Sequence, residues 1–237
     1  MSEQNVINKK TENVAAMFND IAASYDFLNH FLSANTDKVW RKKAVKMLLP
    51  YSPKTILDVA TGTGDLAIAL QKLNLNKTIG IDIADDMLAI GQKKVASIGL
   101  QDKIEFRNGD AMKIPYANAS FDAVTVAFGI RNFEDINKGI SQVYDVLTSN
   151  GVFLILEFSK PGKTFFGTLF QFYFKRILPV AGSLFSKNKK AYRYLFDTVQ
   201  QFPGVDEVKN KLKSHGFREV KTKTLSMGIA TIYVALK

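Results

Sequence analysis

Cysteine is absent from the 237 residues, and histidine occurs only twice. The first absence excludes disulfides, thiol nucleophiles and thiolate metal sites. The two histidines have no matching pattern of acidic residues, so we expect no metal ion. Long hydrophobic runs are missing as well, because no stretch approaches the roughly 18 consecutive apolar residues that span a bilayer. The polar N-terminal stretch also lacks the apolar segment of a secretory signal, which predicts a soluble or peripheral protein.

What is present suffices for a large core. The hydrophobic content of 46% over 237 residues favours one enlarged α/β domain, residues 1–237, over two separate domains. The net charge of +10 is unevenly distributed: residues 1–150 hold 17 basic and 17 acidic residues, whereas residues 151–237 hold 15 and 5. A basic final third favours an anionic membrane or nucleic acid as partner. Simple solubilisation by lysine explains it equally well.

The stretch that organises the chain is residues 56–65, Ile-Leu-Asp-Val-Ala-Thr-Gly-Thr-Gly-Asp. Its apolar start, its glycine turn and the Leu- and Ala-rich sequence after it predict a strand, a loop and a helix. Gly62 and Gly64 carry no Cβ, so a ligand can approach bare peptide groups there. The same spacing also occurs in dinucleotide dehydrogenases, which keeps a nicotinamide-dependent oxidoreductase open as an alternative.

Two aspartates follow the next two predicted strands. Asp82 lies 24 residues after Asp58, about where a carboxylate accepts hydrogen bonds from ribose hydroxyls in a nucleotide-binding α/β unit. Asp110 comes directly after residues 104–108, and an acid there can accept from an exocyclic adenine amine. Both aspartates also suit plainer roles, at a strand end or in a turn. In a doubly wound sheet they lie on the same rim as Gly62.

The remaining pattern continues the alternation of strands and helices. It predicts a mostly parallel, doubly wound sheet with helices on both faces. Arg131 and Asn132 end the fourth strand, so they are expected to face whatever lies beside the cofactor. Strands are expected over 56–59, 78–83, 104–108, 120–129, 152–158, 219–225 and 229–236.

Taken in order, these motifs resemble those of class I S-adenosylmethionine-dependent methyltransferases. The pieces are residues 57–64, Asp82, Gly109 to Ala111, Ser120 to Asp122, and Leu147 to Gly151. A narrower set is similar to the respiratory-quinone C-methyltransferases of menaquinone and ubiquinone biosynthesis, from about residue 14 onward. Its most specific pieces are Phe-Gly-Ile-Arg-Asn at 128–132 and Glu-Phe-Ser-Lys-Pro at 157–161.

The resemblance implies a seven-stranded sheet, an N-terminal helical cap over residues 1–50 and a lid insertion over residues 162–203. Within that insertion, residues 164–196 hold 10 of the 27 aromatic residues and are strongly basic, which suits a cover over an apolar pocket resting on a membrane surface. An ordinary core helix is the plainer alternative. The cofactor implied is S-adenosyl-L-methionine, bound by residues of the loop and the rim. These are Asp58, Gly62, Thr63, Gly64, Asp82, Asp110 and Ala111.

The chemistry implied is methyl transfer to a ring carbon of demethylmenaquinol, or of a ubiquinone-pathway benzoquinol. Arg131 is expected to stabilise the phenolate or to orient a water, with Asn132 positioning it, and Tyr25 and His30 are the two candidates for the base. Ala127 stands where many members of the family it resembles have serine. An alanine side chain cannot make the cofactor contact that a serine hydroxyl there would make. The expected partners are a polyprenylated quinol and the inner face of the cytoplasmic membrane, without nucleic acid, and a homodimer stays open. An RNA methyltransferase and a non-enzymatic membrane-binding module are the remaining alternatives.

Overall fold

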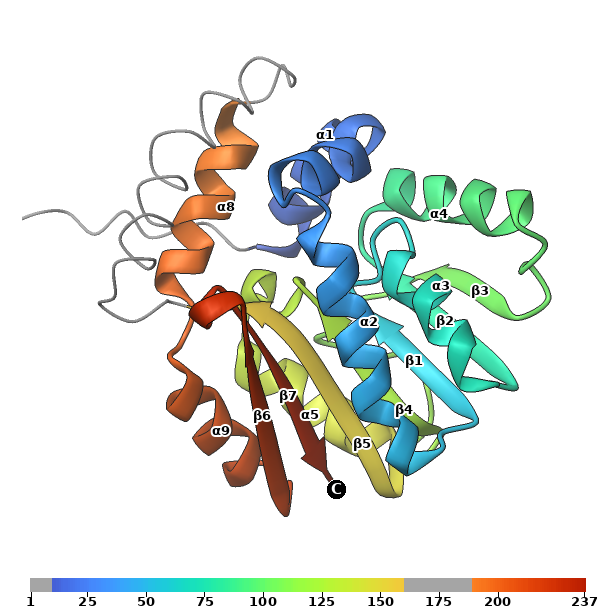
Figure 1. Cartoon of the computed structure of the whole chain (residues 1–237), viewed down its shortest axis with the longest axis vertical. Helices are drawn as coiled ribbons and strands as arrows, with labels where there is room; N and C mark the ends of the chain where they lie inside the picture. The colour runs from blue at the N-terminus through green and yellow to red at the C-terminus, as the bar shows by residue number, and fades with distance from the viewer. Residues whose placement is uncertain (1–9, 160–188) are drawn as a thin grey trace, which may run out of the picture.

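A seven-stranded sheet forms the centre of the computed structural model, which describes residues 10–159 and 189–237 (Figure 1). The strand order is β3-β2-β1-β4-β5-β7-β6, with β7 antiparallel to both of its neighbours. The predicted doubly wound sheet is therefore confirmed. Sequence pattern gave the last two strands but not their order, and β7 lies inside while β6 forms the edge. The strands are β1 Thr55–Val59, β2 Lys77–Asp82, β3 Ile104–Asn108, β4 Phe121–Ala127, β5 Leu147–Phe158, β6 Glu219–Leu225 and β7 Ala230–Leu236.

A layer of helices covers each face of the sheet, and successive side chains of β5 pack alternately against the two layers. Phe153 and Ile155 pack on one face against α5 (Ile136–Val146) and α9 (Val205–Ser214), and Leu154 and Leu156 pack on the other. That second face carries α2 (Thr36–Leu48), α3 (Asp65–Leu70) and α4 (Asp85–Ser97). In Figure 1, α2 passes in front of the sheet and α5 behind it. Each fully buried Leu, Ile or Phe contributes about 1.5–3 kcal/mol to folding.

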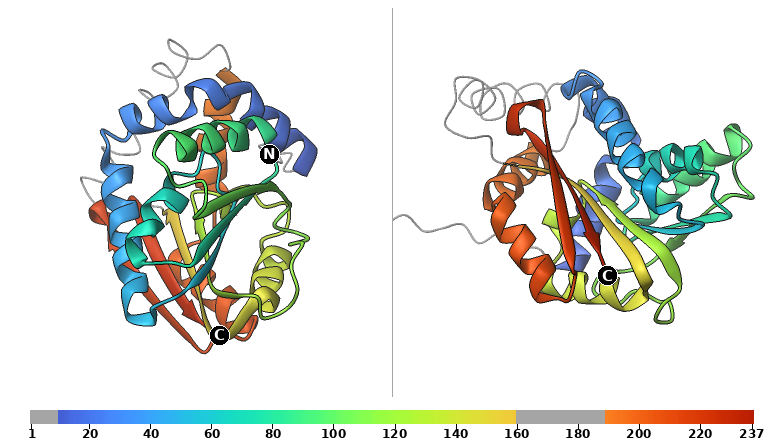
Figure 2. Two further views of the ribbon diagram at one scale, coloured as in Figure 1. Left: turned by 90° about the vertical axis from the view of Figure 1, so that its right-hand side faces the viewer. Right: turned by 60° about the horizontal axis from the view of Figure 1, so that its bottom comes forward.

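Helix α1 (Thr11–Leu32) arches over the carboxyl end of the sheet, as Figure 2 shows. The amphipathic pattern of residues 14–22 predicts a helix there, and in the structure this helix continues for nearly three more turns, to Leu32. Ile21 and Ala22 pack on Ala84 and Met87 of α4. The turn into α2 uses Ala34 and Asn35 in left-handed conformations. Helices α1 and α2 lie within residues 1–50, for which a helical cap is predicted.

Helix α8 (Lys189–Gln201) contacts α1 and is the part of the predicted lid that the structure describes. The rest of that prediction, residues 162–188, lies outside the described residues. No helix in the described ranges is long and apolar enough to cross a membrane. Short 3-10 turns complete the elements: η1 Leu49–Tyr51, η2 Gln71–Leu73, η3 Ile130–Asn132 and η5 Ser226–Gly228.

Candidate functional site

The buried side chain of Asp58 stabilises the glycine loop between β1 and α3. Its buried carboxylate accepts hydrogen bonds from the hydroxyls of Thr61 and Thr125, both at 2.6 Å. The two glycines have different roles. A Cβ on Gly64 would collide with the ring of Phe106, whereas a Cβ on Gly62 would meet no atom within 4 Å. Gly62 therefore presents bare backbone to open space, as expected for a close approach by a ligand.

Asp82, at the end of β2, closes the loop from the other side. Its Oδ2 accepts from the backbone N–H of Gly62 at 2.8 Å, and its Oδ1 accepts from that of Ala84 at 3.0 Å. Burial raises the pKa of the Asp82 carboxyl, and these two backbone hydrogen bonds oppose the rise without cancelling it. Each oxygen keeps a second lone pair, so the carboxylate can still accept from a ligand.

Two adjoining cavities open at this rim. The smaller one, about 70 Å³, is lined by Asp82, Asp110 and Ala111. The larger one, about 490 Å³, is lined by Gly62, Thr63 and the residues of the cap. The residues predicted to lie on one rim therefore line two adjoining cavities. Both cavities share a wall of seven residues: Phe18, Tyr25, Ala60, Gly62, Ala127, Phe128 and Asn132.

Three aromatic side chains form one wall of the larger cavity. The rings of Phe128 and Phe158 have centroids 4.9 Å apart, and Trp40 lies 6.0 Å from Phe128. The indole N–H of Trp40 donates to the hydroxyl of Ser226 at 2.9 Å, which fixes the indole against η5. Such a wall suits a flat aromatic ligand.

A buried ion pair stands beside that wall. Arg131 is 3% exposed and Glu157 is 0% exposed, and their Nη1 and Oε1 atoms lie 2.7 Å apart. The same Nη1 donates to the carbonyl oxygen of Phe128, and the guanidinium carbon lies 5.5 Å from the ring centre of Phe158. Burial raises the pKa of Glu157, and the charge of Arg131 is the strongest opposing influence.

Two polar atoms at this point are buried without a partner among the described residues: Nε of Arg131, a donor, and Oδ1 of Asn132, an acceptor. Both residues line the larger cavity. Buried polar groups in folded proteins are nearly always hydrogen-bonded, so an orphaned pair beside a cavity marks a place for a polar ligand group.

Tyr25 lines both cavities and packs edge-on against Phe18, with ring centroids 6.0 Å apart. Burial raises the pKa of its phenol, and nearby Arg131 lowers it by less. Tyr25 therefore stays protonated at neutral pH, so it is suited to donate a hydrogen bond rather than to act as a base.

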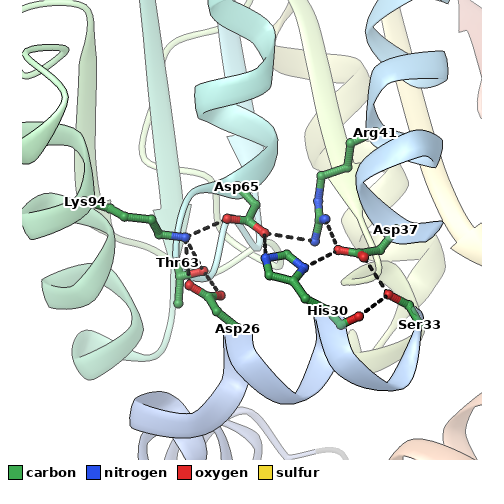
Figure 3. Close-up of polar contacts among 8 residues, drawn as sticks. All are labelled: Asp26, His30, Ser33, Asp37, Arg41, Thr63, Asp65 and Lys94. Atoms are coloured by element: carbon green, nitrogen blue, oxygen red, sulfur yellow. Dashed lines mark hydrogen bonds and ion pairs between the residues drawn. The ribbon is translucent and has the colours of Figure 1, made fainter. Parts of the chain in front are cut away.

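His30 belongs to a network of charged side chains, which is drawn in Figure 3. Its Nδ1 lies 2.8 Å from Oδ2 of Asp37, and its Nε2 lies 3.4 Å from Oδ2 of Asp65. Arg41 pairs with both carboxylates, so a cation already fills the space where these three ligands would hold a metal. His30 is not among the described residues that line either cavity. The two carboxylates that it contacts, Asp37 and Asp65, do line the larger cavity, and its role as the base stays a prediction.

The same network continues to the glycine loop through Lys94 of α4 (Figure 3). The Lys94 ammonium lies 2.8 Å from Asp26 and 2.6 Å from Asp65, and it donates to Thr63 Oγ1 at 3.3 Å. Burial alone would raise the pKa of Asp65, but the charges of Arg41 and Lys94 hold it below its ordinary value. The network thus joins α1, α2, α3 and α4 around the loop.

Sequence reasoning assigned no role to Glu157 or Tyr194, whereas Trp40 belongs to the N-terminal segment that it expected to form one wall of the substrate cavity. Tyr194 of α8 lines the larger cavity, and its hydroxyl is buried without a partner in the described ranges. The only signal for these residues was their place in the motifs that resemble the quinone methyltransferases. Spacing alone cannot bring residues 40, 157 and 194 together.

Comparison with known proteins decides the family. Residues 5–237 match the sequence profile of the ubiE/COQ5 methyltransferase family. The chain belongs to that family. It is 45% identical over 230 residues to the demethylmenaquinone methyltransferase of Bacteroides fragilis, covering 97% of this chain and 94% of the relative. It is 43% identical to the ubiquinone/menaquinone biosynthesis C-methyltransferase of Geotalea daltonii, covering 98% and 99%.

Solved structures share the fold at low sequence identity. An S-adenosylmethionine-dependent methyltransferase from Thermotoga maritima has a TM-score of 0.67 at 19% identity, covering 94% of this chain and 99% of its own. Phosphoethanolamine N-methyltransferase 2 of Haemonchus contortus, solved with S-adenosyl-L-methionine, has a TM-score of 0.60 at 15% identity, covering 82% and 52%. The ubiE/COQ5 family member described here is therefore an S-adenosylmethionine-dependent methyltransferase. This excludes the nicotinamide-dependent oxidoreductase.

The buried carboxylate under the loop leads to a pH prediction. Burial raises the pKa of Asp58 to about 6, and the hydrogen bonds from Thr125 and Thr61 only partly oppose it. Its contribution to stability is therefore present below about pH 4 and lost as the pH rises through about 6. The loss amounts to roughly 3 kcal/mol. We expect Asp58→Asn to remove this loss, measured as the difference in unfolding free energy from wild type in urea between about pH 4 and 7.5. A difference that does not change with pH would contradict it.

Proposed function

We propose that this methyltransferase transfers a methyl group from S-adenosylmethionine to a ring carbon of demethylmenaquinol, giving menaquinol. The relatives in Bacteroides fragilis and Porphyromonas gingivalis, 45% and 43% identical, are named for demethylmenaquinone. The Geotalea relatives carry a name that covers both quinones. The equivalent methylation of a benzoquinol is the second candidate, and the test below separates the two.

The chemistry of the residues around the smaller cavity and the glycine loop suits the cofactor. Asp82 offers acceptor lone pairs to the two ribose hydroxyls, Asp110 can accept from the adenine amine, and Gly62 leaves room for the chain to pass. Ala111 lines the same cavity, Thr63 lines the larger one, and Asp58 acts through the loop that it supports. When bound, S-adenosylmethionine supplies an electrophilic methyl group on a sulfonium.

The observation that carries the substrate assignment is the orphaned pair in the larger cavity. A hydroxyl group both donates and accepts, and here Asn132 Oδ1 lacks a donor while Arg131 Nε lacks an acceptor among the described residues. A quinol hydroxyl offers what each atom lacks: a donor for Asn132 Oδ1 and an acceptor for Arg131 Nε. The aromatic wall of Trp40, Phe128 and Phe158 beside them suits the flat ring.

These residues then favour reaction at carbon. Deprotonating the quinol hydroxyl gives the ring carbanion character, and the buried Arg131 stabilises the resulting negative charge. Asn132 orients the hydroxyl, and protonated Tyr25 donates a hydrogen bond from the shared wall. With His30 outside the cavities, we assign removal of the hydroxyl proton to solvent water. The chain thus contributes alignment and charge stabilisation.

The test is incubation with methyl-labelled S-adenosylmethionine and each of two reduced acceptors, demethylmenaquinol and the corresponding demethylated benzoquinol. We expect label in the ring of the naphthoquinol. Label in the benzoquinol alone would transfer the proposal to the second candidate. Transfer to neither acceptor, with the cofactor still bound by calorimetry, would refute a quinol substrate.

A separate prediction concerns Tyr194. Burial raises the pKa of its phenol to about 12, so it remains a donor, and its hydroxyl lies buried beside the cavity. If this hydroxyl donates to the quinol, Tyr194→Phe removes one neutral hydrogen bond and raises KM for the quinol roughly 10-fold. The Kd for S-adenosylmethionine stays unchanged. Equal weakening of cofactor and quinol binding would indicate a merely structural hydroxyl.

A further inference from the structure

The outer face of α2 is cationic along its whole length. The exposed residues of this helix are Lys38, Val39, Lys42, Lys43 and Lys46, four lysines and one valine. Lys38, Lys42 and Lys46 are spaced by four residues, so they form one stripe. The helix buries its acidic residue, Asp37, on the opposite side against Arg41 and His30. Within the described ranges, none of the four lysines lies in an ion pair.

Helix α9 differs from α2, because it carries acidic residues that pair with its lysines. On α9, Lys209 lies 3.8 Å from Asp206, and Lys211 lies 3.8 Å from Glu207. Solubility is served by such mixed charge. A helix face with four cations and no exposed acid concentrates positive potential instead, which favours a flat anionic partner.

The inner side of the same helix belongs to the larger cavity. Thr36, Trp40 and Arg41 line it. The lining residues that are also well exposed are Phe31, at 55% in the last turn of α1, and Ala34, between α1 and α2. Within the described part of the chain, this places the opening of the cavity beside the N-terminal end of α2. The lysine stripe begins close by, at Lys38.

We propose that the outer face of α2 binds the anionic phospholipid headgroups of a membrane, so that the cavity opening meets the bilayer surface. This inference rests on the proposed function, because a polyprenylated quinol dissolves in the bilayer and must reach the cavity from it. The stripe supplies the attraction, and each lysine near an anionic leaflet strengthens binding by an amount that falls off within a Debye length. Val39 adds a small apolar contact between the lysines.

Vesicle binding tests the surface directly. The full-length protein is sedimented with vesicles of phosphatidylglycerol and phosphatidylcholine, or of phosphatidylcholine alone. The variant K38Q/K42Q/K46Q is compared with K209Q/K211Q/K213Q, which removes the same charge from α9 on the other face of the sheet. We expect the α2 variant to lose on the order of 100-fold in binding to the anionic vesicles, and the α9 variant to lose little. Equal losses in both variants would overturn the proposal.

Activity separates this inference from the proposed function. The α2 variant should methylate a water-soluble, short-tailed demethylmenaquinol as fast as wild type, and a long-tailed one in anionic vesicles more slowly. Equal rates on the vesicle-bound quinol would refute the docking face. No turnover of either quinol by the wild type would refute the proposed function and leave the vesicle-binding result standing. Release of the protein from vesicles by RNA, with tighter binding to RNA than to lipid, would indicate a nucleic-acid surface instead.

Discussion

Replacing Arg131 with methionine is expected to abolish turnover and also to lower the free energy of unfolding by about 3–5 kcal/mol. The reason is the carboxylate that remains. Glu157 is 0% exposed, and among the described residues its Oε1 otherwise accepts only from the backbone N–H of Phe158, at 2.8 Å. An unpaired charge in that position costs far more than the ion pair itself contributes. Urea unfolding at neutral pH measures the loss.

A second substitution separates stability from catalysis. In R131M/E157Q the buried charge is gone, so most of the lost stability returns, while turnover stays roughly 100- to 1,000-fold below wild type because the phenolate has lost its cation. Arg107→Met is the matched control, since Arg107 is half exposed and pairs with Glu105 at the surface. Its stability should change by less than about 1 kcal/mol. Wild-type turnover by the double variant would show that Arg131 holds the fold only.

Local sequence was sufficient to predict the elements around the glycine loop. Residues 56–65 predict a strand, a loop and a helix because each of these depends on neighbouring residues, and the structure has the strand as β1 and the helix as α3. Asp82 and Asp110 were predicted on one rim because parallel strands end at the same edge of a sheet. Local periodicity is sufficient for both inferences.

Contacts between distant residues were out of reach. The hydrogen bond of Trp40 to Ser226 joins positions 186 residues apart, and no pattern along the chain encodes it. His30 has the residue type of a base, yet its contacts with Asp37 and Asp65 depend on how α1, α2 and α3 meet. Residue type suggested chemistry for His30, and three-dimensional packing determines its actual partners.

The largest effect on cofactor binding is expected from Asp82→Asn. The side-chain amide keeps one acceptor oxygen, so it can serve the N–H of Gly62 or that of Ala84, and its own NH₂ opposes the other. The ribose hydroxyls lose a charged acceptor, and hydrogen bonds to charged groups are worth about 1.5–3 kcal/mol each. We therefore expect the Kd for S-adenosylmethionine, measured by calorimetry, to rise about 100-fold or more.

Asp86→Asn is the control, because Asp86 is exposed at the start of α4 and lines neither cavity in the described residues. It removes the same charge four residues away and should leave the Kd unchanged. Asp110→Asn should fall between the two, since its Oδ1 already accepts from the backbone N–H of Met112 at 2.9 Å and only part of its acceptor capacity remains for the adenine. If the control weakened binding as much as Asp82→Asn, the effect would come from net charge, and the assignment of Asp82 to the ribose would be wrong.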